Sequence, residues 1–216
     1  AMIPVVRRRY LRTLQATLSA RGALALDVEP ITDAAGREAL RAMLESDEPR
    51  QALLALEQLG DERSPQITAL LERLLTSPEP RVRAAAVDRY AQAIGARADA
   101  VLPLLSDPSV DVRAAAARSY AAIARDESID LLVSLTTDAE RDVRSAALAG
   151  LLLHGGIEGD ITGGARLAAL LGSGSRDERA EAAAVLGTLG PEAYRPIRRL
   201  LGDGEPTVRR AALRAC

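Results

Sequence analysis

The sequence predicts an all-α fold: an α-α superhelix of about six helical hairpins that stack as a solenoid, with an N-terminal capping helix. Composition is the first reason. The 216 residues include 42 Ala and 33 Leu but no Phe and no Trp, and a core of small and leucine side chains is typical of close-packed helices. The second reason is a unit of about 30 residues that recurs along the chain, because tandem units of this length stack into repeat arrays.

The repeated unit runs from a leucine through a polar turn, often with Pro, to Val-Arg and a pair of alanines. Its arginines are Arg83, Arg113, Arg144, Arg179 and Arg209. They are 30, 31, 35 and 30 residues apart. A weaker copy comes first, with Ala52 in the arginine position. One hairpin cannot bury its own apolar face, so the units must stack on one another.

Each unit is predicted to form two helices. In the first helix of one unit, Ile67, Leu71 and Leu74 fall on a single helical face. The second helix opens with an acidic residue or Ser, often followed by Pro, which suits the first helical position. The predicted helices span 4–21, 33–45, 48–60, 64–76, 79–94, 98–106, 109–125, 127–136, 140–154, 162–171, 175–189, 192–202 and 205–216.

The longest spacing comes from the glycine-rich stretch that follows His154. We expect Gly155–Gly164 to form a connecting loop, with Asp160 or Thr162 as the cap of the next helix. A phosphate-binding loop is the alternative. It is disfavoured because the stretch lacks a Gly-Lys-Ser/Thr ending and follows a helix and not a strand.

The unit resembles the HEAT repeat, in the short form that also occurs in phycobilisome lyases. The resemblance covers roughly residues 33–216, and the Asp/Pro turn followed by Val-Arg-x-Ala-Ala carries it. It implies a ladder between neighbouring repeats, in which the repeat arginines meet the turn residues Asp107, Asp138 and Asp203. Ser77 and Ser173 occupy the turn position in the other two repeats, so a partial ladder is expected.

Residues 1–30 do not match the repeat and are predicted to be a capping segment, whereas residues 31–216 form the array. The predicted first helix carries a basic cluster at Arg7–Arg12. We interpret this cluster as the solvated face of the cap; the alternative is contact with anionic lipid or nucleic acid. The start at Ala1-Met2 and the end at Cys216, within a repeat, suggest a piece excised from a larger protein.

Several classes of chemistry lack the residues they need. A single Cys, the last residue, and a single His leave no thiolate or two-imidazole metal site. No apolar run reaches the length of a membrane span, and no signal peptide opens the chain. We therefore predict no enzyme activity, no catalytic or metal-binding residues and no cofactor.

The favoured function is a non-enzymatic scaffold that binds a protein partner or an adjoining domain of the same polypeptide. The second helices would line a concave face, with positions one and five residues after each arginine pointing outward. The predicted face comprises Asp88, Arg118, Ser145, Arg210 and Arg214, together with Ala84, Ala114 and Ala149.

Two other functions stay open. The first alternative is a soluble regulatory domain of a bacterial membrane transporter of the nucleotide-carrier type, to which the order of segments is similar. The second is a nucleic-acid-binding repeat protein, which the net charge of −2 disfavours. The predicted location is the cytoplasm, or the cytoplasmic side of the inner membrane if the chain is fused to a transporter.

Overall fold

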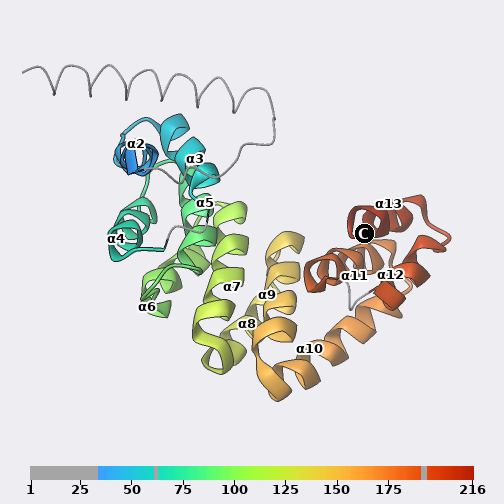
Figure 1. The fold of residues 1–216 in the computed structure, drawn as a ribbon. Coiled ribbons are helices and arrows are strands. Elements are labelled where there is room, and N and C mark those ends of the chain that lie inside the picture. Colours follow the sequence, from blue (N-terminus) through green and yellow to red (C-terminus); the bar gives the residue numbers. More distant parts are fainter. Residues whose placement is uncertain (1–33, 61–62, 191–193) are drawn as a thin grey trace, which may run out of the picture. The chain divides into compact units, whose positions relative to one another are not determined.

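A computed structural model describes residues 34–60, 63–190 and 194–216 (Figure 1). The predicted capping helix 4–21, its Arg7–Arg12 cluster and the boundary at residue 30 lie outside the described residues. The chain divides into two compact units, Ala1–Ala96 and Arg97–Cys216. The division falls inside the predicted repeat array, at the connection between two repeats.

The first unit contains two helical hairpins. Its helices are α2 (Ala34–Leu44), α3 (Pro49–Gln58), α4 (Pro65–Leu74) and α5 (Pro80–Tyr90). Helix α2 packs on α4 and α3 packs on α5, so helices of the same kind stack on one another. The fully buried side chains include Leu40, Met43, Leu56, Leu71 and Tyr90.

Local sequence explains where these helices start. Pro occupies the first position of α3, α4 and α5, where the missing N–H would have no helical partner. Before α4, the Ser64 hydroxyl accepts a hydrogen bond from the Ile67 N–H at 3.3 Å. The phenol of Tyr90 is also satisfied, because it donates to Glu72 Oε1 at 2.7 Å.

The second unit continues the same pattern with four more pairs. Its first-position elements are α6 (Ala98–Val101) with the 3₁₀ helix η1 (Leu102–Ser106), η2 (Arg125–Ser128) with α8 (Ile129–Leu135), α10 (Gly156–Leu171) and α12 (Tyr194–Leu201). Its second helices are α7 (Val110–Ala124), α9 (Arg141–His154), α11 (Arg176–Leu189) and α13 (Pro206–Arg214). The described residues contain no strand, and the all-α, repeat-type fold class is confirmed.

The second helices of this unit form a continuous layer. Helix α7 packs on α9, α9 on α11, and α11 on α13. Small residues allow the approach: a Cβ built on Gly150 of α9 would lie 2.7 Å from the Ala121 Cβ of α7. A Cβ built on Gly187 of α11 would lie 2.9 Å from the Cα of Ala215, the residue that follows α13. The alanine-rich composition therefore serves helix-to-helix contact.

The prediction of a loop at Gly155–Gly164 is wrong. Helix α10 begins at Gly156, so the predicted caps Asp160 and Thr162 both lie inside it. The glycines recur every four residues on one face, where α10 crosses the end of α9. A Cβ on Gly159 would lie 2.4 Å from the Leu151 carbonyl oxygen, and one on Gly163 would lie 3.0 Å from Leu152 Cγ. Packing outweighs the low helix propensity of glycine here.

Pro103 explains why the first segment of the second unit is not a continuous α-helix. The predicted helix 98–106 is a single α-helical turn followed by η1, which contains Pro103. Proline cannot donate the backbone hydrogen bond that an α-helix would need at that point. Pro196, in contrast, lies in the first turn of α12 and leaves that helix intact.

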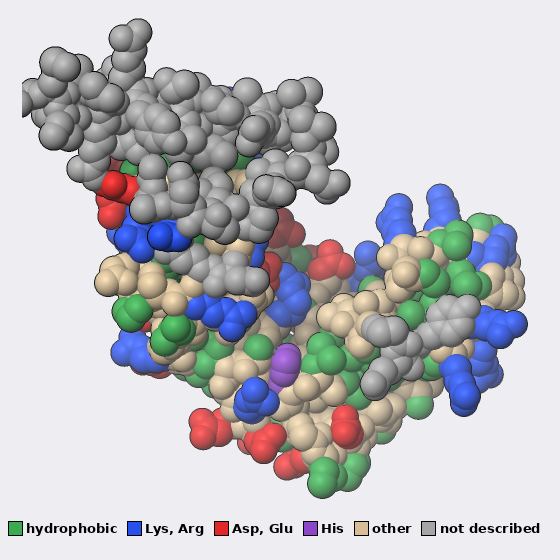
Figure 2. Space-filling view, viewed as in Figure 1, with side chains coloured by type: hydrophobic (Ala, Val, Ile, Leu, Met, Phe, Trp, Pro, Cys, Tyr) green, Lys and Arg blue, Asp and Glu red, His purple; other side chains and the backbone are tan. Residues whose placement is uncertain are grey.

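Charge and hydrophobicity gather at different places on the second unit. Arginine side chains cluster over the α12–α13 end in the view of Figure 2. Exposed aliphatic side chains are found where α10 starts, at Ile157 and Ile161. Within the described ranges, no helix has both the length and the apolar character that crossing a bilayer requires.

Candidate functional site

Each repeat arginine is anchored to the turn that precedes its own helix. Its Nη1 donates to the carbonyl oxygen of the turn residue six positions earlier, at 2.7 to 3.0 Å. The same nitrogen donates to the next carbonyl, at 2.9 to 3.4 Å. The accepting turn residues are Ser77, Asp107, Asp138, Ser173 and Asp203. The arginine thereby fixes the angle between the two helices of each hairpin.

The side chain of the turn residue closes the turn. Asp107, Asp138 and Asp203 each accept a hydrogen bond from the backbone N–H two residues later, at 2.8, 2.8 and 2.9 Å. Ser77 and Ser173 accept the same bond through their hydroxyls, at 3.3 and 3.0 Å. Asp and Ser are therefore interchangeable for the turn itself.

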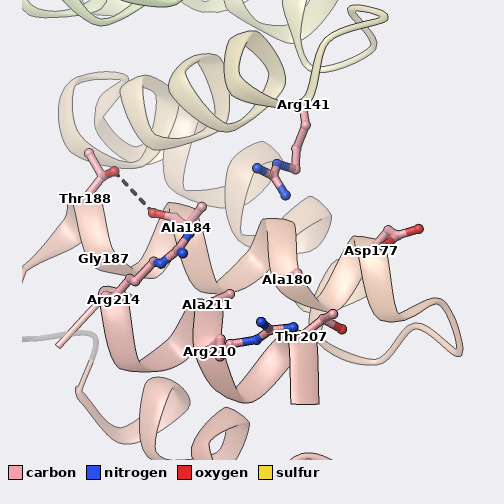
Figure 3. A pocket seen from close by; sticks show the side chains of 11 residues that line it. Arg141, Asp177, Ala180, Ala184, Gly187, Thr188, Thr207, Arg210, Ala211 and Arg214 are labelled. Atoms are coloured by element: carbon pink, nitrogen blue, oxygen red, sulfur yellow. Dashed lines mark hydrogen bonds between the residues drawn. The ribbon is translucent and has the colours of Figure 1, made fainter. Parts of the chain in front are cut away.

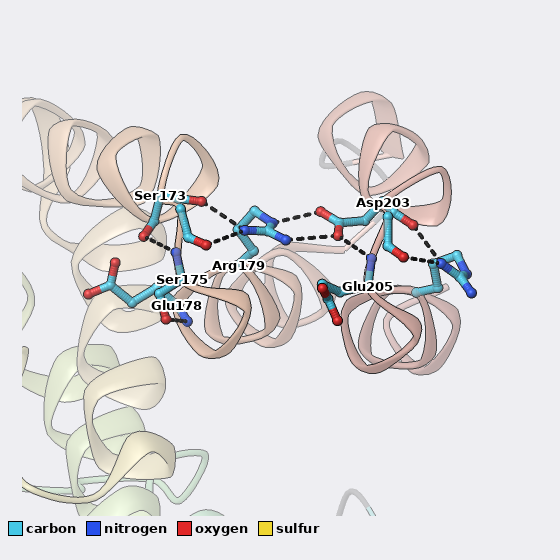
Figure 4. Close-up of polar contacts among 9 residues, drawn as sticks. Ser173, Ser175, Glu178, Arg179, Asp203 and Glu205 are labelled. Atoms are coloured by element: carbon cyan, nitrogen blue, oxygen red, sulfur yellow. Dashed lines mark hydrogen bonds and ion pairs between the residues drawn. The ribbon is translucent and has the colours of Figure 1, made fainter.

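Only an acidic turn residue can also pair with the preceding repeat. Arg179 donates from Nε and Nη2 to the carboxylate of Asp203 at 2.7 and 3.0 Å (Figure 4). Arg113 lies 3.6 Å from Asp138 through Nη2 and Oδ1. The hydrogen bonds from Arg179 and from the Glu205 N–H lower the pKa of Asp203, and Asp203 in turn raises the pKa of Arg179.

Where the turn residue is Ser173, a different acid takes the arginine. Arg144 donates through Nε to both carboxylate oxygens of Glu181, at 3.2 and 3.1 Å, and through Nη2 as well. Glu181 lies on α11 and its side chain is 4% exposed. This bidentate contact raises the pKa of Arg144.

Sequence reasoning missed Glu181, although a signal was present. Glu181 follows its repeat arginine by two positions, and that column otherwise holds alanine: Ala85, Ala115, Ala146 and Ala211. The identifying pattern has two parts. The turn residue that should meet Arg144 is Ser173, and an acid replaces alanine in the helix that follows this turn.

The remaining ladder residues hold their own turns. Arg83 binds the carbonyls of Ser77 and Pro78 at 2.8 and 3.1 Å. Arg209 binds those of Asp203 and Gly204 at 2.7 and 2.9 Å. Ser77, which lacks a carboxylate, follows the one repeat in which Ala52 replaces the arginine. No carboxylate is needed at that step.

The residues of the predicted interaction face differ in their exposure to solvent. Asp88, Arg118, Arg210 and Arg214 are exposed. The Ser145 hydroxyl is buried and finds no hydrogen-bond partner among the residues that the structure describes. The prediction that Ser145 faces outward is therefore wrong, because α9 lies between two closely packed helices.

Two alanines predicted to face outward are also buried. Ala114 is 5% exposed and Ala149 is 1% exposed. Ala149 packs in a cluster with Ala182 and Val185 of α11. The position five residues after the arginine is thus a helix-to-helix contact in α9, where small residues bring the helices together.

An open groove lies between α11 and α13, with the start of α9 at its rim (Figure 3). Its volume is about 580 Å³. We call it the α11–α13 groove, and its lining residues are Arg141, Asp177, Ala180, Ala184, Gly187, Thr188, Thr207, Arg210, Ala211, Arg214 and Ala215. It thus includes two arginines of the predicted face.

A family model described as HEAT repeats matches residues 98–156, from α6 to the start of α10. This segment of the chain is similar to HEAT repeats. The matched segment contains Arg113, Asp138 and Arg144, so the HEAT match and the arginine contacts coincide. No curated protein matches the sequence.

Two solved structures of helical-repeat proteins are similar to this chain in fold alone. One is the complex of CpcE and CpcF of phycocyanin lyase from Nostoc sp. PCC7120, with 23% identity, a TM-score of 0.46, and coverage of 70% of this chain and 99% of that one. Another is the designed armadillo repeat protein YIII(Dq)4CqI, with 23% identity, a TM-score of 0.44, and coverage of 82% and 96%.

His154 ends α9, as the sequence predicts, and Gly155 follows it as the cap residue. Burial, and secondarily the charge of Arg125, lower the pKa of His154. The imidazole therefore stays neutral to a lower pH than an exposed histidine would.

Proposed function

We propose that the protein is a non-enzymatic helical-repeat scaffold, which uses the layer of second helices to bind a protein partner or an adjoining domain. The carrying observation is the α11–α13 groove, an open depression of about 580 Å³ on that layer. Repeat arrays use surfaces of this kind for recognition, because each repeat adds one helix to an extended face.

The chemistry of the layer supports binding. Exposed arginines stand beside a floor of alanine and glycine, which combines charge with apolar contact area. The arginine contacts between repeats hold α9, α11 and the turn before α13 in fixed positions. A partner would therefore meet a preformed surface, which reduces the entropy lost on binding.

Site-specific photo-crosslinking tests this proposal. A benzophenone amino acid replaces the exposed Ala184 on the second-helix layer, and in a matched variant it replaces the exposed Ala169 on α10. We expect a defined protein adduct, or a crosslink to an adjoining domain, from position 184 and none from position 169. Adducts from position 169 alone, or from neither position in cells that express the whole protein, contradict the proposal.

The alternative is a regulatory domain on the cytoplasmic side of a bacterial membrane transporter. It rests on the order of the N-terminal segments and not on the groove. The complete open reading frame tests it: hydrophobic spans upstream of residue 1 support the transporter, and a reading frame without such spans contradicts it.

A further inference from the structure

We infer that the α11–α13 groove binds an acidic helical segment of the protein partner. This inference rests on the proposed scaffold function and assigns the chemistry of what is bound. Three features of the groove carry it: a floor of small residues, an excess of arginine at its walls, and the spacing of two of those arginines.

The floor of the groove consists of small residues. It is formed by Ala180, Ala184 and Gly187 of α11 with Ala211 and Ala215 of the neighbouring segment. None of these side chains extends beyond Cβ, so an incoming helix can approach the backbone closely. From Ala180 to Thr188 the floor runs for roughly 12 Å, about two helical turns at 1.5 Å per residue.

The walls carry positive charge that the chain itself does not neutralise. Arg210 and Arg214 project from α13, and Arg141 reaches over the groove from α9 (Figure 3). In the part of the chain that the structure describes, neither Arg210 nor Arg214 has an ion pair or a side-chain hydrogen bond.

The other two charges at the rim change this balance little. Among the described residues, Arg141 forms an ion pair only with Asp142, at 3.5 Å with both side chains more than half exposed, and such an exposed pair contributes little. Asp177 is the one acid of the lining, and its carboxylate points away from the groove.

The spacing of the arginines favours a helical occupant. Arg210 and Arg214 are four residues apart on α13, so they lie one helical turn apart on the same side. A partner helix with Glu or Asp four residues apart repeats this distance. It can pair with both guanidiniums while its alanine or leucine face lies on the floor.

Nucleic acid fits the groove less well. None of the described residues that line it is aromatic, so these side chains offer bases nothing to stack on. An adjacent depression at the starts of α9 and α11 is rich in acids, including Glu140, Asp142 and Glu178. These carboxylates would repel a phosphate backbone that continues past the groove, whereas a short segment confined to the groove stays beside Arg210 and Arg214.

Fluorescence anisotropy with a defined probe tests the inference. The probe is a labelled alanine-rich peptide of about four helical turns with glutamates four residues apart; the same peptide with glutamine at those positions is the control. We expect the full chain to bind the glutamate peptide at least about tenfold more tightly than the glutamine peptide, with affinity that falls as salt rises.

Three variants locate the binding. R210E/R214E reverses the wall charges, and A184L fills the floor; each is expected to weaken binding by roughly tenfold or more. R195E/R199E is the matched control, because it makes the same charge change, with the same spacing, on exposed positions of α12. It should bind the glutamate peptide almost as the parent chain does. Circular dichroism checks that all variants remain helical.

The results separate this inference from the proposed function. Equal loss in R210E/R214E and R195E/R199E, tight binding of the glutamine peptide, or preference for a DNA duplex over the peptide overturns the acidic-helix inference. Peptide failure with a crosslink from position 184 overturns this inference and leaves the scaffold function standing. Failure of both overturns both.

Discussion

At the scale of single residues, the turn position of each repeat serves two functions that can be separated. Asp203 closes its own turn and also accepts Arg179 of the preceding repeat. Ser173 performs only the first function. At that repeat the carboxylate that accepts the hydrogen bonds of Arg144 comes from Glu181 of the neighbouring helix. The chain thus keeps the contact between repeats while moving one of its partners.

Moving the acid back tests this interpretation. E181A is expected to lower the free energy of unfolding by about 1–3 kcal/mol, since it removes charge-assisted hydrogen bonds from Arg144. Adding S173D to E181A should recover most of that loss, because the acidic turn residues Asp138 and Asp203 meet the arginine of the preceding repeat. Urea denaturation of the single and double variants measures both effects.

S77D is the control for the relocated acid, because Ala52 stands where the preceding repeat would have its arginine. We expect S77D to leave stability almost unchanged. A gain from S77D as large as the recovery by S173D would show that any added turn carboxylate stabilises the chain, whatever its partner.

The single histidine makes a second prediction at this scale. Burial and Arg125 lower the pKa of His154 in the folded state, so the unfolded chain binds the proton more readily. The free energy of unfolding should therefore fall as pH drops from about 7.5 to about 5.5, through the ordinary histidine pKa. Urea titrations should show a smaller fall for H154Q. An identical fall in both proteins would place its cause elsewhere.

At the scale of helices, two glycines of α10 differ in whether a larger side chain could replace them. Gly159 lies against the backbone of α9, where a Cβ would come within 2.4 Å of the Leu151 carbonyl oxygen. A Cβ on Gly164 would meet nothing within 4 Å. The same residue type therefore serves packing at one position and has no packing role at the other.

Alanine substitution distinguishes the two positions. G159A should destabilise the protein by about 1–3 kcal/mol, because the helices must move apart. G164A, its control in the same helix, should stabilise it by up to about 1 kcal/mol through higher helix propensity. Thermal and urea unfolding measure both. Stabilisation by G159A would contradict the close contact of α10 with α9.

The same contrast explains how far the sequence predicts this structure. The positions of the hairpins can be predicted from the repeated arginines and from Pro at the helix starts, because these signals are local and recur in each repeat. The helical state of Gly156–Gly164 could not be predicted in that way, since it depends on contact with Leu151 and Leu152, which propensity does not describe.

The candidate surface was predicted only in part, for a related reason. Arg210 and Arg214 are exposed at the last helix of the stack, as their position in the repeat predicts. The equivalent positions in α7 and α9, Ala114 and Ala149, are buried by neighbouring helices. The repeat pattern gives the helical face, but the distance between adjacent helices decides whether that face reaches solvent.

At the scale of the whole molecule, the two compact units share one building plan. In each unit, helices of the same kind pack on one another: α3 on α5 in the first, and α7 to α13 in the second. Stability then comes from contacts between neighbouring hairpins. The second-helix layer remains available for recognition, and its open groove lies at α11 and α13.

Amide hydrogen exchange of the full chain, with and without the alanine–glutamate peptide, tests most directly which surface binds. We expect slower exchange at Arg176–Leu189 and Pro206–Arg214, the two helices of the groove, and no change at Gly156–Leu171 on the other layer. Protection confined to Gly156–Leu171, or spread evenly along the chain, would contradict the claim that the second-helix layer is the binding surface.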